Sequence, residues 1–89
     1  MAEISRFFGI VIHMFSERGS PHHRPHLHAK YQEFRAVLAL DNIEVLAGQL
    51  PPRQERLLLG WAELHQEELL AAWQIAISGT SPPSVEPLK

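Results

Sequence analysis

The chain has 89 residues, no cysteine and a formal net charge of -2. This length suits one domain, and the lack of thiols excludes disulfides, cysteine nucleophiles and cysteine-ligated zinc. A hydrophobic fraction of 45% argues against disorder, and the charge argues against a dedicated, strongly basic nucleic-acid binder. We therefore expect a globular domain of the reducing cytoplasm, with no signal peptide and no membrane association.

The first predicted element is a strand over residues 4–15, rich in β-branched and aromatic side chains. It ends at a turn-forming cluster that begins at Ser16 and includes Gly19. Alternation along a strand places Phe8, Ile10, Ile12 and Met14 on one face. It places Val11, His13 and Phe15 on the opposite face.

Three more strands are predicted after a proline-containing loop over residues 16–25. Turn residues at Gln32-Glu33 and Asp41-Asn42 separate them. The strands are expected at residues 26–31, 34–40 and 44–50. The result is an antiparallel sheet of about four strands, including the first.

Helix is predicted from Pro52, because proline fits a first helical turn and apolar residues then recur with a period near 3.6. One continuous helix would be too long for the sheet to cover, so we expect two, over residues 52–65 and 67–78. The predicted fold class is α+β, with this C-terminal helical hairpin packed on one face of the sheet. Residues 1–79 form the domain, and residues 80–89 are expected to be a flexible tail.

Histidine is the unusual component, with six copies in the chain. His26 and His28 are two apart in a predicted strand, so they are expected on one face with Lys30. His13 is expected to project from the same uncovered face. The simplest interpretation is that these are solvated polar side chains, and three functional interpretations compete with it.

The first is a transition-metal site, because imidazole suits zinc and nickel; its candidate ligands are His26, His28 and His22. The second is a metal-independent ribonuclease. In that case His26 and His28 would move the protons, while Lys30, Arg24 or Arg35 would stabilise the charge on phosphorus.

The third interpretation is a binding surface for a partner or for RNA, with an affinity that depends on pH. Its candidate residues are Arg24, Arg35 and His13. Exposed sheet edges also make a homodimer reasonable.

Three segments of the sequence resemble the domain of unknown function 4160 family of small bacterial proteins. They are residues 4–12, residues 25–29 (Pro-His-Leu-His-Ala) and residues 61–73, which contain Trp61 and Trp73. The resemblance covers residues 3–77, and His26 and His28 match the two histidines of the family's Pro-His-aromatic-His stretch.

This resemblance implies a component of a two-gene module similar to toxin–antitoxin pairs. It further implies a small partner protein encoded nearby and allows RNA as a target. We therefore expect a small cytosolic protein that binds a partner protein and RNA. Ribonuclease activity and zinc or nickel binding are the alternatives.

Overall fold

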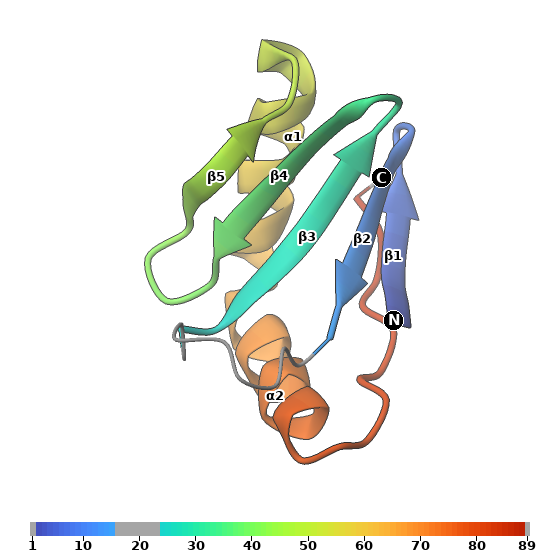
Figure 1. The fold of residues 1–89 in the computed structure, drawn as a ribbon, viewed down its shortest axis with the longest axis vertical. Coiled ribbons are helices and arrows are strands. Elements are labelled where there is room, and N and C mark those ends of the chain that lie inside the picture. Colours follow the sequence, from blue (N-terminus) through green and yellow to red (C-terminus); the bar gives the residue numbers. More distant parts are fainter. Residues whose placement is uncertain (1, 16–23, 89) are drawn as a thin grey trace.

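The computed structural model describes residues 2–15 and 24–88. Each strand pairs antiparallel with the next one in the chain, so the sheet has the order β1-β2-β3-β4-β5 (Figure 1). The predicted α+β class is confirmed. The elements are β1 (Ala2–Phe7), β2 (Ile10–Met14), β3 (His26–Tyr31), β4 (Phe34–Ala39), β5 (Glu44–Gln49), α1 (Pro52–Leu64) and α2 (Gln66–Ile77).

The predicted strand over residues 4–15 is a hairpin of two strands, so the sheet has five strands and not four. Phe8 and Gly9 form a two-residue turn with φ of 48° and 80°, and Phe7 pairs with Ile10 across it. Positive φ at both turn positions matches the twist of the flanking strands. Phe8 is not a typical turn residue, which is why the sequence reads as continuous strand; its side chain is exposed and lies outside the core.

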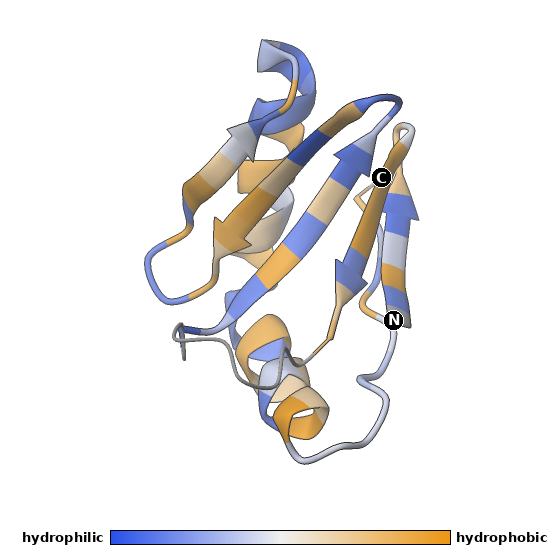
Figure 2. Ribbon diagram, in the orientation of Figure 1, coloured by the Kyte–Doolittle hydropathy of each residue, from blue (hydrophilic) through white to orange (hydrophobic). Residues whose placement is uncertain are grey.

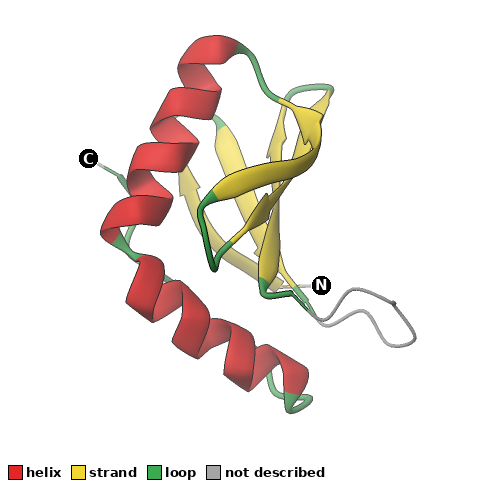
Figure 3. Ribbon diagram, turned by 90° about the vertical axis from the view of Figure 1, so that its left-hand side faces the viewer, coloured by secondary structure: helices red, strands yellow, loops and turns green. Residues whose placement is uncertain are grey.

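Both helices lie on one side of the sheet (Figure 3). They follow one another with a bend at His65, so they do not turn back on themselves as the predicted hairpin would. The His65 N–H donates to the Trp61 carbonyl, and its ring Nδ1 lies 3.1 Å from Glu68 Oε1. Leu64 is exposed beside this bend.

The core lies between the helices and one face of the sheet. Hydrophobic and hydrophilic residues alternate along β3, as expected for a strand with one covered face (Figure 2). Trp61 and Trp73 are both buried, so they belong to the core. The other fully buried large side chains are Ile4, Ile10, Ile12, Met14, Leu27, Leu38, Leu40, Leu58 and Leu69.

The C-terminal segment is anchored in its described part, residues 80–88, in contrast to the loose tail expected from the sequence. The Val85 N–H donates to the Ile4 carbonyl of β1 at 2.8 Å, and the Trp61 Nε1–H donates to the Glu86 carbonyl at 2.8 Å. The Val85 side chain is buried. Figure 1 shows this segment returning from α2 to pass beside β1, so it covers that end of the sheet.

Candidate functional site

The face of the sheet opposite the helices carries basic side chains at neighbouring positions. The register pairs His13 of β2 with His28 of β3, and Lys30 of β3 with Arg35 of β4. Paired residues on adjacent strands point to the same face, which brings side chains distant in sequence together. The register therefore places four nitrogen-bearing side chains on three neighbouring strands.

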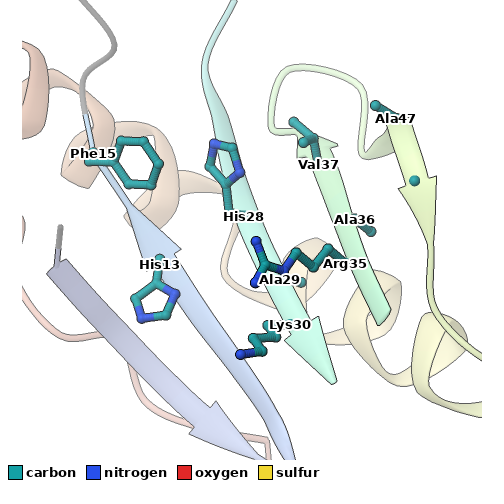
Figure 4. A pocket seen from close by; sticks show the side chains of 10 residues that line it. His13, Phe15, His28, Ala29, Lys30, Arg35, Ala36, Val37 and Ala47 are labelled. Atoms are coloured by element: carbon teal, nitrogen blue, oxygen red, sulfur yellow. The ribbon is translucent and has the colours of Figure 1, made fainter. Parts of the chain in front are cut away.

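These side chains line a hollow of about 470 Å³ on this face. Figure 4 shows Arg35 extending from β4 over β3, where His28 stands beside its guanidinium, with His13 and Phe15 on the far side of β3. The rest of the lining is small or aliphatic. Among the residues described, the lining includes no acidic side chain. The hollow is therefore a concave surface suited to an anion.

Lys30 and Arg35 are both exposed, and no ion pair is found for either within residues 2–15 and 24–88. The register places Glu3 of β1 opposite His13, but this carboxylate lies 2.8 Å from the guanidinium of Arg6. The hydrogen bond from Arg6 lowers the pKa of Glu3 below its ordinary value. Glu3 is thus held by a cation outside the hollow, and among the described residues no carboxylate pairs with Lys30 or Arg35.

Gly48 shapes the rim of the hollow beside Arg35. Its φ is +72°, and a Cβ built there would lie 2.1 Å from the carbonyl oxygen of Arg35. Only glycine allows the backbones of β4 and β5 to approach this closely at that conformation. The position of the strand that carries Arg35 therefore depends on Gly48.

His26 is separated from this hollow, although it lies two residues before His28. Its side chain is buried, its ring centroid lies 4.9 Å from that of Trp73 in α2, and its Nδ1 is 2.9 Å from the Arg24 carbonyl. The rings of His26 and His28 meet edge-on with centroids 5.4 Å apart. His28 also stacks on Phe15, with centroids 4.6 Å apart and an interplanar angle of 13°.

The two predicted histidines therefore occupy different environments. His28 lines the hollow with Lys30, whereas His26 packs against a helix at the end of the sheet. His13, which was expected on the uncovered face, also lines the hollow. Phe15 is a site residue that the predicted function did not use, although alternation had placed it on the same face as His13.

Arg24 has a different position from the other predicted binding residues. Its guanidinium makes two hydrogen bonds to Asp41, at 2.9 and 3.1 Å, and one to the Asn42 side chain at 3.0 Å. The hydrogen bond from Arg24 lowers the pKa of Asp41. Arg24 thus ties the start of β3 to the β4–β5 turn, and it does not line the hollow with Arg35.

His22, the third predicted metal ligand, lies outside the described residues. Within the described ranges, no group of three or more histidine or acidic side chains is placed to hold a metal ion. His26 and His28 remain the two predicted ligands whose positions are described.

The fold and the site define a small α+β protein with a basic, aromatic-lined hollow on the uncovered face of its sheet. Residues 9–74 match the model of the family described as Domain of unknown function (DUF4160), and the chain belongs to this family. No curated protein and no solved structure matches the chain. Within the part of the chain that the structure describes, no helix has the length and apolar character to span a membrane.

Proposed function

We propose that this protein binds single-stranded RNA through the basic hollow, as a cytoplasmic component of a two-gene module. The observation that carries the proposal is the register of β2, β3 and β4. It gathers His13, His28, Lys30 and Arg35 around one concave surface. Phosphate contacts from lysine and arginine supply most of the affinity of proteins for nucleic acids.

The aromatic side of the hollow favours RNA over an acidic protein segment. Phe15 lies against His28, beside the two cations. Proteins that bind single strands combine a positive groove for the backbone with aromatic rings on which bases stack. The carboxylates of an acidic peptide would use the cations but would gain nothing from the rings.

The size of the hollow is consistent with one nucleotide of a longer strand. Its volume of about 470 Å³ lies within the range of small-ligand pockets, roughly 300–1,000 Å³. Flanking nucleotides would continue along the uncovered face of the sheet. We therefore expect a short single strand, not a duplex, to be the better ligand.

Fluorescence anisotropy with a labelled RNA strand of about ten nucleotides tests this function. The strand carries 2′-O-methyl groups, so that it can bind without being cleaved. The double variant Lys30→Gln/Arg35→Gln should bind at least about tenfold more weakly, because it lacks both exposed cations of the hollow. The matched control is Arg53→Gln/Arg56→Gln, which removes two exposed charges from α1. Equal affinity of the two double variants would contradict the proposal.

A partner protein is also part of the proposed module, and the outer edge of β5 supports this. Among the described residues no strand pairs with that edge, whereas residues near Val85 lie beside β1 at the other end. An uncharged segment follows Glu44 in β5, and exposed edges without charge can pair with another chain. Co-expression with the neighbouring gene product, followed by purification, tests this part. Light scattering of the protein alone measures its mass in solution, and so shows whether the chain forms a homodimer in the absence of a partner protein.

Zinc or nickel binding is the competing proposal. The ring centroids of His26 and His28 lie 5.4 Å apart, which is close enough for two ligands of one ion. Metal analysis of protein purified without a histidine tag separates the two proposals. Stoichiometric zinc or nickel that is lost in the His26→Ala variant would favour the metal site.

A further inference from the structure

We infer that the hollow also cleaves the RNA that it binds, with His13 and His28 as its acid–base pair and without a metal ion. The inference rests on the proposed function, because it requires RNA in the same hollow. It differs from the pair expected from the sequence, His26 and His28. The register makes the difference, since it joins histidines of two strands that are separated by 15 positions in the chain.

The positions of the two imidazoles suit this chemistry. Residues directly opposite on antiparallel strands have Cβ atoms about 4.5–5.5 Å apart, and both side chains here line the same hollow. In Figure 4 the two rings lean apart along the strands, His28 toward Phe15 and His13 away from it, which leaves space between them. A phosphodiester placed there would have one imidazole on each side.

The reaction is a transfer within the RNA chain. One imidazole accepts the proton of a 2′-hydroxyl, and the 2′-oxygen forms a bond to the adjacent phosphorus. The bond from phosphorus to the 5′-oxygen breaks, and the second, protonated imidazole donates its proton to that oxygen. The products are a 2′,3′-cyclic phosphate and a 5′-hydroxyl, so atoms and charge balance without a co-reactant. Imidazole suits both roles because it titrates near neutral pH.

Two cations are placed to stabilise the charge that develops on the phosphate. The guanidinium of Arg35 overlies β3 between His28 and Lys30 in Figure 4, on the side of the hollow that faces His13. Arg35 and Lys30 are paired across β3 and β4, so both reach the same anion. Fixed cations directed at a developing oxyanion are among the strongest contributions to catalysis.

The stack of Phe15 on His28 gives the second imidazole a defined orientation. The His28 ring lies nearly parallel to Phe15 and meets the edge of His26. His26 itself is buried against Trp73 and does not line the hollow, so it would position His28 without touching RNA. The three histidines thus have different roles. His13 and His28 would act at the phosphate, and His26 would position His28.

Cleavage of a labelled single-stranded RNA in excess EDTA tests the inference, with the products analysed for a 2′,3′-cyclic end. The variants are His13→Asn and His28→Asn, and the control is His65→Ala, at the helix bend away from the hollow. Each single variant should cleave at least about 100-fold more slowly, a loss much larger than any accompanying fall in its affinity for the 2′-O-methyl strand. Because His28 packs on two rings, unfolding by urea is measured in parallel, and His13→Asn decides the result if His28→Asn fails to fold.

The failure of the inference can be separated from that of the proposed function. Binding of the 2′-O-methyl strand without cleavage of RNA by the wild type would overturn the inference and leave RNA binding intact. Cleavage that is equal in the wild type and in His13→Asn would also overturn it. Absence of binding by the wild type would overturn both. Loss of cleavage at a single 2′-deoxy position, with cleavage elsewhere, would support attack by the 2′-oxygen.

Discussion

His13 of β2 and His28 of β3 lie directly opposite one another in the sheet, and both line the basic hollow on its uncovered face. This relationship joins one histidine that precedes residues 16–25 with one that follows them. His26, the near neighbour of His28 in sequence, meets the edge of its ring but is itself buried against Trp73 and does not line the hollow. The predictions below test the contacts that produce this arrangement.

Removal of the Phe15 ring should weaken RNA binding without changing its dependence on salt. Phe15 stacks on His28 and carries no charge, so Phe15→Ala should cost about 1–3 kcal/mol of binding free energy through lost base stacking. Phe8→Ala is the matched control, because Phe8 is exposed in the β1–β2 turn at the other end of the hairpin. Anisotropy titrations at several salt concentrations give both quantities. A steeper or shallower salt dependence for Phe15→Ala would count against stacking.

His26 should matter for stability more than His13 does. His26→Ala removes a buried ring from Trp73 and leaves the Arg24 carbonyl without that contact, so we expect a loss of about 1–3 kcal/mol in unfolding free energy. His13→Ala, on the uncovered face, should change it by no more than about 0.5 kcal/mol. Urea unfolding followed by tryptophan fluorescence measures both. Equal losses would refute the different roles given to the two side chains.

Gly48→Ala should destabilise the fold and disturb the hollow. The added Cβ would lie 2.1 Å from the Arg35 carbonyl oxygen, and φ there is +72°, so we expect a cost of about 1–3 kcal/mol. Gly60→Ala is the opposite control: the position is helical and nothing lies within 4 Å of the new Cβ. It should stabilise the protein by about 0.5–1 kcal/mol. The urea midpoint should fall for Gly48→Ala and rise for Gly60→Ala, relative to the wild type. Midpoints that move in the same direction would contradict this account.

The Arg24–Asp41 pair should stabilise the folded protein at neutral pH and lose this effect in acid. Its hydrogen bond lowers the pKa of Asp41 in the folded protein, so the contribution is present above the ordinary carboxyl pKa near 4 and is lost as pH falls through the lower folded value. The wild type should therefore exceed Asp41→Asn in stability by a constant margin from about pH 5 to 8, and by less below about pH 4. In the Arg24→Gln background this margin should lose most of its pH dependence. Thermal unfolding across pH provides the measurement.

The C-terminal segment should stabilise the domain through Val85. Its side chain is buried and its N–H binds the Ile4 carbonyl, so Val85→Ala should cost about 1–2 kcal/mol. Ser84→Ala changes the exposed neighbouring residue and should be close to neutral. Deletion of residues 80–89 should exceed the effect of Val85→Ala, because it also exposes Trp61. A deletion variant as stable as the wild type would show that the segment contributes nothing.

Local patterns in the sequence predicted most of the fold. Strands at 26–31, 34–40 and 44–50 match β3, β4 and β5 to within one residue, because their period-2 alternation is bounded by turn residues. The helices begin and end close to the prediction, since Pro52 in the first turn and the 3.6-residue period of apolar residues are local features. The β1–β2 turn was missed because Phe8 adopts a left-handed conformation that its side chain does not favour. The anchoring of Val85 depends on a contact with residues 81 positions earlier, which no local pattern contains.

The sequence by itself determined that this is a cysteine-free α+β domain with its histidines concentrated in the first half, and that His13, His28 and Lys30 would face away from the core. Tertiary structure alone decided which histidines line the hollow. Alternation fixes the face of a side chain, but only the register between strands fixes its neighbours, and only the path of α2 buries His26 under Trp73. For that reason the hollow is lined by one histidine from each of two strands, and not by both histidines of β3.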